Sequence, residues 1–122
     1  MSLLLPPISG MRKKPLLPEE TEKGIQKATL DWLYYQGFYA FRFNSGAIKQ
    51  EYKGKSRIIR LGKTGMPDIL AVKDGKFFGF EIKNATGKLT QAQQDMHETL
   101  KYYGAKVYVI RSTSDLDPKK IK

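Results

Sequence analysis

The sequence predicts an α/β fold in which a mixed β-sheet is flanked by helices. Helix-like and strand-like patterns follow one another in the order helix, strand, basic segment, hairpin, helix, strand, which favours layers of helix on sheet. The central hairpin, over residues 68–83, carries apolar residues on both faces, as expected of a sheet that is covered on both sides. With 122 residues, the chain can form one domain around a single core.

Residues 1–17 are expected to form an extended, basic arm, and the folded domain is placed at 18–122. Three prolines and Gly10 interrupt the arm, so it lacks the pattern of a packed helix or strand. Met11 is an alternative to Met1 as the natural first residue, and the sequence does not decide between them. The arm also contains three consecutive basic residues, Arg12, Lys13 and Lys14.

The first helix is expected over about 18–36, followed by a strand over 38–43. Pro18 suits a first helical turn, and Gly37 suits the position that follows a helix. The segment 38–43 alternates and is rich in aromatic residues, as strands are. The helical residues whose spacing predicts an apolar stripe are Ile25, Ala28, Trp32 and Leu33.

Residues 47–64 form a strongly basic segment, in which Arg57–Leu61 alternates enough to predict a short strand. Two interpretations of this segment are open. It is either a solvated β-ribbon whose charges serve solubility, or a surface that follows the phosphates of a nucleic acid beside the hairpin.

The dipeptide Asp74-Gly75 between two apolar runs predicts a two-residue hairpin turn, because a type I′ turn needs positive φ at both central residues. In the register that this turn sets, Asp68 lies directly opposite Glu81. Paired side chains on one face have Cβ atoms about 4.5–5.5 Å apart. Lys83 lies two residues beyond Glu81 and is therefore expected on the same face.

Two carboxylates side by side repel each other unless a cation lies between them. A divalent metal with oxygen ligands fits that position, and the carbonyl oxygen of Ile82 can serve as a further ligand. A lysine beside the pair, Lys83, can orient a water molecule or neutralise charge on a phosphate. Together these are the parts of metal-assisted phosphodiester hydrolysis. The alternative is that Asp68 and Glu81 merely end their strands and Lys83 bridges one of them at the surface.

The second helix is expected to begin at Thr90, where Thr90-Gln91-Ala92-Gln93 has the pattern of a capping box, and to end at Gly104. A buried strand is expected over 105–111, and a short helix is expected near 115–120. The residues expected to form the buried stripe of the second helix are Leu89, Ala92, Met96, Leu100 and Tyr103.

The chain carries 22 Lys and Arg against 12 Asp and Glu, a formal net charge of +10. This surplus favours a polyanionic partner, of which nucleic acid is the usual one and an anionic membrane the other candidate. The absence of cysteine excludes disulfides and thiolate metal sites. The single histidine, His97, excludes a multi-histidine metal centre. It lies one turn after Gln93 and points either toward the hairpin site or toward solvent, and a structural or exposed role is expected rather than a catalytic one. No stretch approaches the ~18 apolar residues of a membrane span, so we expect no membrane partner and a cytoplasmic location.

Five short motifs occur in the order in which one known family has them, over about residues 20–112. They are Glu22-Lys23-Gly24-Ile25-Gln26, Arg42-Phe43-Asn44-Ser45-Gly46, Gly65-Met66-Pro67-Asp68, Glu81-Ile82-Lys83, and Gly87-Lys88-Leu89-Thr90 with Gln93. Together they resemble the VRR-NUC family of the PD-(D/E)xK nuclease superfamily. The resemblance implies a restriction-endonuclease-like fold, that is, a mixed β-sheet flanked by helices.

The resemblance also implies a Mg²⁺ or Mn²⁺ site at the hairpin, with Lys83 positioning the attacking water and stabilising charge. Gln93 would lie near this site, although its place in the capping box explains it equally well. Glu22 would face the metal from the first helix, although an acid there also suits the helix dipole. Gln26, one turn later, either touches the site or is exposed. The implied metal ligands are Asp68, Glu81, the carbonyl oxygen of Ile82, and Glu22 directly or through water.

The implied activity is that of a structure-selective DNA endonuclease, a homodimer that cuts branched DNA such as four-way junctions or flaps and leaves 5′-phosphate and 3′-hydroxyl ends. Contacts to phosphates carry no base information, so recognition by DNA shape is expected. The alternative is a DNA-binding subunit of a larger repair or restriction complex, inactive or unspecific alone. Tyr34, Tyr35 and Tyr102 are expected either at a dimer contact or against bases. The residues expected to bind nucleic acid are Lys49, Lys53, Lys55, Arg57, Arg60, Lys63, Asn44, Arg12, Lys13 and Lys14.

Overall fold

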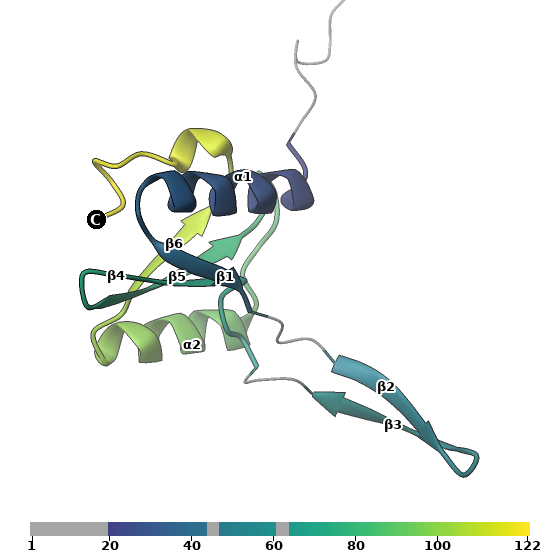
Figure 1. Cartoon of the computed structure of the whole chain (residues 1–122). Coiled ribbons are helices and arrows are strands. Elements are labelled where there is room, and N and C mark those ends of the chain that lie inside the picture. The colour runs from purple at the N-terminus through teal and green to yellow at the C-terminus, as the bar shows by residue number, and fades with distance from the viewer. Residues whose placement is uncertain (1–19, 44–46, 61–63) are drawn as a thin grey trace, which may run out of the picture.

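The computed structural model describes residues 20–43, 47–60 and 64–122 of the chain. A four-stranded sheet lies between two helices, and a separate two-stranded ribbon projects from one end of this body (Figure 1). The predicted α/β class is thus confirmed. In chain order the elements are α1 (Glu22–Tyr35), β1 (Tyr39–Arg42), β2 (Ala47–Tyr52), β3 (Lys55–Arg60), β4 (Ile69–Lys73), β5 (Lys76–Ile82), α2 (Gln91–Tyr102), β6 (Lys106–Ile110) and the short 3-10 helix η2 (Thr113–Asp115).

The four-stranded sheet has the strand order β1-β4-β5-β6 and is mixed, as predicted. β4 pairs antiparallel with both β1 and β5, whereas β5 and β6 are parallel and are connected through α2. The predicted register of the β4–β5 hairpin is confirmed, since Ile69 pairs with Phe80. Its turn is also confirmed, because Asp74 and Gly75 have φ values of 51° and 76°.

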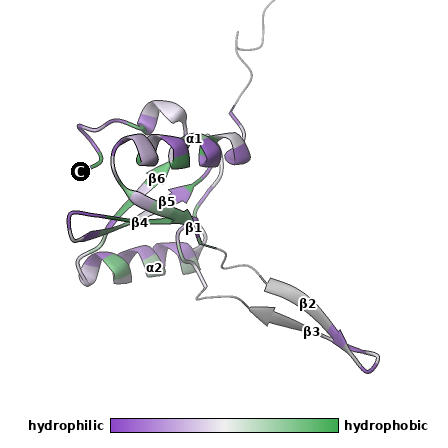
Figure 2. Ribbon diagram, viewed as in Figure 1, coloured by the Kyte–Doolittle hydropathy of each residue, from purple (hydrophilic) through white to green (hydrophobic). Residues whose placement is uncertain are grey.

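The core of the body lies between α1 and the sheet. α1 buries Ile25, Thr29 and Leu33 against the aromatic residues of β5. Phe78 packs edge-on against Phe38, with ring centroids 4.9 Å apart. Full burial of one such apolar side chain contributes about 1.5–3 kcal/mol. Hydrophobic residues are therefore concentrated in the strands between the helices, whereas the tip of the ribbon is hydrophilic (Figure 2).

α1 begins at Glu22, later than the predicted start near 18, because Thr21 caps the helix. The Oγ1 of Thr21 accepts a hydrogen bond from the backbone N–H of Gly24 at 3.0 Å, which satisfies one of the free donors of the first turn. The predicted apolar stripe is confirmed in part. Ile25 and Leu33 are buried, but Ala28 and Trp32 are half-buried, and Thr29 takes the inner position between them.

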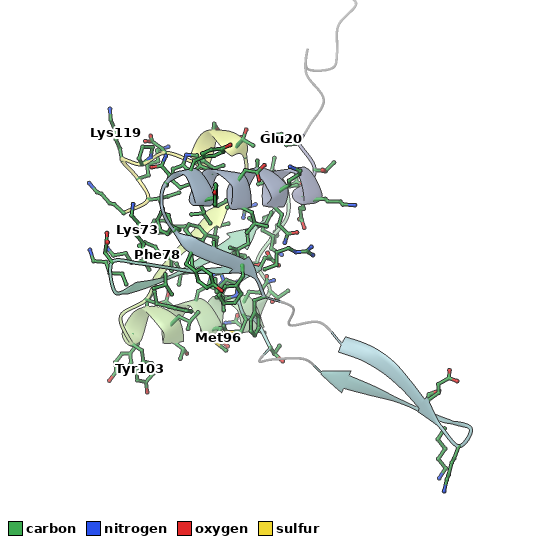
Figure 3. The ribbon with its side chains drawn as sticks, in the orientation of Figure 1. Glu20, Lys73, Phe78, Met96, Tyr103 and Lys119 are labelled. Atoms are coloured by element: carbon green, nitrogen blue, oxygen red, sulfur yellow. The ribbon has the colours of Figure 1, made fainter. Side chains whose placement is uncertain are left out.

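α2 begins with the predicted capping box, since Gln93 and Thr90 exchange backbone and side-chain hydrogen bonds of 3.1 and 2.9 Å. The prediction that Tyr103 is buried is wrong, because its side chain is 81% exposed at the outer end of α2 (Figure 3). The helix ends at Tyr102, and Tyr103 is its C-cap, so helical spacing no longer directs this side chain toward the sheet. The predicted stripe residues are at most half-buried, and the buried residue of α2 is His97.

The basic segment forms a ribbon of two strands, one more than the sequence predicted. β2 and β3 pair around Lys53 and Gly54, whose φ values of 52° and 77° make a tight turn. The short helix predicted near 115–120 is wrong in position: η2 spans Thr113–Asp115, because Ser112 caps it there. The predicted arm, 1–17, lies outside the described residues. Within the described parts of the chain, no helix is long and apolar enough to cross a membrane.

Candidate active site

Asp68 and Glu81 are neighbours at one end of the β4–β5 hairpin. The backbone N–H of Ile82 donates to Asp68 Oδ2 at 2.8 Å, and the backbone N–H of Phe43 donates to the Asp68 carbonyl oxygen, also at 2.8 Å. These bonds hold Asp68 just before β4, where the ladder places it opposite Glu81. The side-by-side arrangement that the turn predicted is therefore present.

The Glu81 side chain is 1% exposed, and both of its oxygens have partners on α2. Oε1 lies 3.0 Å from Nε2 of buried His97, and Oε2 accepts a hydrogen bond of 3.3 Å from Nε2 of Gln93. Gln93 thus takes part in the capping box and also contacts Glu81, so neither interpretation of this residue excludes the other. Each carboxylate oxygen has two lone pairs, so these contacts leave Glu81 able to bind a cation as well.

Burial raises the pKa of Glu81 to about 9, and the neighbouring Asp68 carboxyl adds to this rise, whereas Lys83 opposes it. Burial also lowers the pKa of His97, and the charge of Lys101 lowers it further. Both shifts have the same cause, since removal from water disfavours the charged form of either group. At neutral pH the pair is therefore a protonated carboxyl and a neutral imidazole, and a cation beside Glu81 would favour its ionised form.

Glu22 and Gln26 reach the same site from α1. A cavity of about 130 Å³ is lined by Glu22, Lys23, Gln26, Asp68 and Ile82. Glu22 Oε2 accepts a hydrogen bond from the backbone N–H of Asn84 at 3.2 Å, which holds the carboxylate over the end of β5. The structure thus brings Glu22 to Asp68, as the resemblance implied, and it places Gln26 beside the cavity rather than in open solvent.

Lys83 lies where β5 leaves the sheet, and its backbone N–H donates to the carbonyl oxygen of Ile110 at 3.0 Å. The following loop passes close to its side chain. A methyl group on Gly87 would lie 3.4 Å from Cδ of Lys83 and 3.5 Å from Oε2 of Glu22. Lys83, Glu22 and this loop therefore converge on one side of the acidic pair.

The loop after Lys83 is held by two residues that sequence reasoning missed, Asn84 and Arg111. Asn84 Oδ1 accepts a hydrogen bond of 2.7 Å from the backbone N–H of Gly87. Arg111 Nη1 donates to the carbonyl oxygens of Asn84 and Gly87 at 3.0 and 2.6 Å. An asparagine three residues before a glycine is a turn signal that could have indicated the first of these contacts, but the contact with Arg111 spans distant parts of the chain.

The loop that carries Asp68 fits tightly against both α2 and the sheet. Gly65 has φ of +85°, and a methyl group on it would overlap the carbonyl oxygen of Ala92. A methyl group on Gly79 would lie 2.8 Å from Cγ of Pro67. Because Gly79 has no side chain, the loop can approach the sheet closely here, through Pro67.

The donors at this site suit a hard divalent cation, because two carboxylates and a backbone carbonyl supply oxygen ligands. Among the described residues, however, no group of three or more His, Cys, Asp or Glu side chains is arranged to hold a metal ion. A metal at Asp68 and Glu81 would therefore need the Ile82 carbonyl oxygen, water and substrate to complete its ligands.

Those residues expected to bind nucleic acid that the structure describes lie on the ribbon of β2 and β3. Lys53 and Lys55 are exposed at the tip of the ribbon, and Lys49, Arg57 and Arg60 belong to its strands. The helix tyrosines, by contrast, lie on the body, and Tyr34, Tyr35 and Tyr102 are all exposed. The expected residues outside the described parts of the chain are Arg12, Lys13, Lys14, Asn44 and Lys63.

A scan of protein-family models finds no match for this chain, and a search of curated proteins finds none either. The functional interpretation therefore depends on the side chains and their geometry. Within that geometry the most informative feature is a buried carboxyl, Glu81, that lies beside a second carboxyl, Asp68, at the edge of a small cavity.

Proposed function

We propose that this chain is a metal-dependent DNA endonuclease of the PD-(D/E)xK superfamily, similar to the VRR-NUC family, with a restriction-endonuclease-like sheet. The observation that carries the proposal is the position of Asp68 beside buried Glu81 at the end of a tightly packed hairpin. Burying one carboxyl beside another is costly unless a cation or specific hydrogen bonds compensate. Such an arrangement is typical of sites where a perturbed pKa serves chemistry.

Asp68, Glu81 and the carbonyl oxygen of Ile82 would hold Mg²⁺ or Mn²⁺, and Glu22 would contribute through water. The ion, when bound, supplies Lewis-acid polarisation of the scissile phosphate and lowers the pKa of a bound water. The hydrogen bond from Gln93 and the contact with His97 would keep the Glu81 side chain directed toward the site. Such positioning contacts decide how well a metal site is preorganised.

Lys83 would orient the attacking water and neutralise charge that develops on the phosphate. Hydrolysis then adds the water oxygen to phosphorus and breaks the bond from phosphorus to the 3′ oxygen. The products are a 5′-phosphate and a 3′-hydroxyl, which takes up a proton. The loop held by Asn84 and Arg111 supports this step, because it packs beside the Lys83 side chain.

We propose branched DNA, such as four-way junctions or flaps, as the substrate and a homodimer as the active form. The net charge of +10 and the projecting ribbon support a polyanionic partner. Two equivalent sites on a two-fold axis suit a junction that must be cut twice. Phosphate contacts favour recognition of DNA shape over base sequence.

A second candidate is a DNA-binding subunit of a larger repair or restriction complex, inactive or unspecific alone. The observation that favours it is the lack, in the described parts of the chain, of a cluster of three acidic or histidine metal ligands. In that case a partner protein would complete the site.

The test is a nuclease assay on labelled linear duplex, single strand, flap and four-way junction, with Mg²⁺, Mn²⁺ or EDTA. We expect metal-dependent cutting that prefers one branched substrate. Lys83→Ala should lower the rate about 100-fold or more, the typical effect of removing a group that stabilises transition-state charge. Lys76→Ala is the matched control, because Lys76 is an exposed lysine at the other end of β5.

Cutting in EDTA, or equal rates for Lys83→Ala and wild type, would contradict the proposed chemistry. Binding of DNA by a folded wild-type chain that never cuts would favour the binding-subunit candidate. Light scattering on the same samples measures whether the chain is a dimer.

A further inference from the structure

A second cleft lies beside the acidic cavity, between the first turns of α1 and the end of β1. It has a volume of about 500 Å³ and is lined by Thr21, Lys23, Gly24, Gln26, Lys27, Leu30 and Arg42. Lys23 and Gln26 also line the cavity that contains Asp68. The two hollows are therefore neighbours that share a wall, and a ligand strand can pass from one to the other along that wall.

Three cationic side chains face this cleft, and no acidic residue belongs to its lining. Lys23 and Arg42 form no hydrogen bond or ion pair through their side chains within the described parts of the chain. Lys27 pairs with Asp31 at 3.1 Å, but both side chains are exposed, at 80% and 61%. Such exposed pairs contribute little to stability, so an anion can readily displace Asp31.

The cleft also lies at the base of the ribbon. Arg42 is the last residue of β1, and its cross-strand partner is Ile69, the residue that follows Asp68. Beyond Arg42 the chain continues into β2 and β3, whose tip carries exposed Lys53 and Lys55 (Figure 1). Positive charge is thus present both in the cleft and at the tip of the ribbon that follows it in the chain.

We propose that the cleft of Lys23, Lys27 and Arg42 binds a backbone phosphate of the same DNA strand whose neighbouring phosphodiester lies at Asp68. This inference rests on the proposed function, and it names the subsite that would hold the DNA strand during cleavage. The guanidinium of Arg42 presents a planar fork that matches phosphate oxygens, and the two lysines add point charges on one helix face. Gln26, between the two hollows, is placed to donate to the strand as it passes.

The test measures binding of a fluorescent oligonucleotide by anisotropy, in EDTA, over a series of NaCl concentrations. The variants are Arg42→Gln and Lys23→Gln, and Lys76→Gln is the matched control, since it removes one exposed charge from the far end of the β4–β5 hairpin. We expect each cleft variant to lower the slope of log affinity against log salt by about 0.7–0.9. The affinity at physiological salt should fall about fivefold, by the same relation.

Arg42→Lys separates charge from structure, because it keeps the positive charge and should keep the salt slope of wild type. Inorganic phosphate at equal ionic strength should not displace the oligonucleotide. Displacement by phosphate at low millimolar concentration would make the cleft a free-phosphate site and overturn the inference. The inference is also overturned if Arg42→Gln and Lys23→Gln behave like Lys76→Gln.

The outcomes separate this inference from the proposed function. A wild-type chain that cuts DNA while the cleft variants keep their salt slopes would overturn the cleft and leave the nuclease proposal in place. A wild-type chain that binds with the expected slopes but never cuts would support the cleft and contradict the nuclease proposal. A folded chain that binds no DNA would overturn both.

Discussion

The two faces of the four-stranded sheet are covered by helices of similar length, 14 residues in α1 and 12 in α2, but the helices bury different things. α1 places Ile25, Thr29 and Leu33 against the aromatic core, with Ile25 and Leu33 fully buried. α2 buries His97, and this side chain meets Glu81 rather than an apolar neighbour. One face therefore holds the fold together by apolar burial, and the other holds polar groups in place.

An amphipathic pattern alone therefore does not distinguish a helix that packs the core from a helix that holds site residues. Both helices have apolar residues at helical spacing, yet those of α2 stay at most half-buried. On this face the loop before β4 lies against α2 at Gly65 and against the sheet at Pro67. Substitutions on the two faces should therefore differ in how much stability they remove and in the kind of interaction that is lost.

The largest effect is expected on the α1 face. Leu33→Ala should lower the free energy of unfolding by about 2–5 kcal/mol, because Leu33 is fully buried and its removal leaves a cavity. Met96→Ala, on half-buried α2, should cost clearly less, since fewer of its contacts are lost. Urea unfolding of both variants measures the difference. Equal losses of unfolding free energy would show that the two faces contribute alike to stability and would contradict this prediction.

The next effect tests how the Asp68 loop is held on α2. Gly65→Ala should destabilise by about 2–4 kcal/mol, because positive φ is strained for alanine and the new methyl group overlaps the Ala92 carbonyl oxygen. Gly75→Ala is the control, since Gly75 has φ of +76° but nothing within 4 Å of the added methyl group. Its cost should be about 1–2 kcal/mol, the conformational part alone. If thermal unfolding shows the same loss of stability for both variants, the loop around Gly65 moves to admit the methyl group without an energetic cost.

A smaller effect is expected when the partner of Glu81 is removed. His97→Leu should cost about 1–3 kcal/mol, because it leaves a buried carboxyl oxygen with one partner fewer. His97→Gln can still donate to Glu81 and should recover part of that loss. Denaturation in urea distinguishes the two. If leucine is tolerated as well as glutamine, the polar contact does not stabilise this face.

The last prediction concerns the pH dependence of the metal-free protein. The pKa of Glu81 is raised from 4.5 to about 9, so between these values the folded chain binds more protons than the unfolded chain. The stability contributed by Glu81 is full below about pH 4.5 and declines as pH rises toward 9, by at most about 1.4 kcal/mol per pH unit.

The variant Glu81→Gln has no such group, so its unfolding free energy should fall less between pH 5 and 9 than that of wild type. The difference between the two urea-unfolding curves removes the contribution of the other titrating groups. Parallel curves would show that Glu81 ionises in the folded chain as it does in water.

The sequence predicted the fold class and the acidic pair because both depend on local rules. A two-residue turn determines the pairing of its strands, so Asp74 and Gly75 were sufficient to place Asp68 opposite Glu81. The capping box of α2 is local for the same reason. Gln93 and Thr90 are three residues apart, and their mutual hydrogen bonds follow from that spacing.

The parts that sequence reasoning missed depend on contacts between distant residues. Nothing near Arg111 indicates that it holds the loop of Asn84. For His97, one turn after Gln93, the sequence left two directions open, toward the site or toward solvent, and the structure places the side chain against Glu81. Thr29 is missed for a different reason. A buried threonine breaks the apolar stripe in the sequence, but its hydroxyl donates to the Ile25 carbonyl oxygen at 2.7 Å and is thereby satisfied.

In the sequence, the ribbon of β2 and β3 lies between β1 and β4, and these two strands pair with each other in the sheet. β1 pairs with β4 over the whole length of β1, and the backbone N–H of Phe43 still donates to the Asp68 carbonyl oxygen, so the two strands remain joined up to the point where the ribbon begins. The ribbon is thus an insertion between two strands that are hydrogen-bonded to each other in the sheet. Its length and charge can change, in evolution or in the laboratory, without moving the carboxylates, so the reach of this protein can be tuned independently of its chemistry.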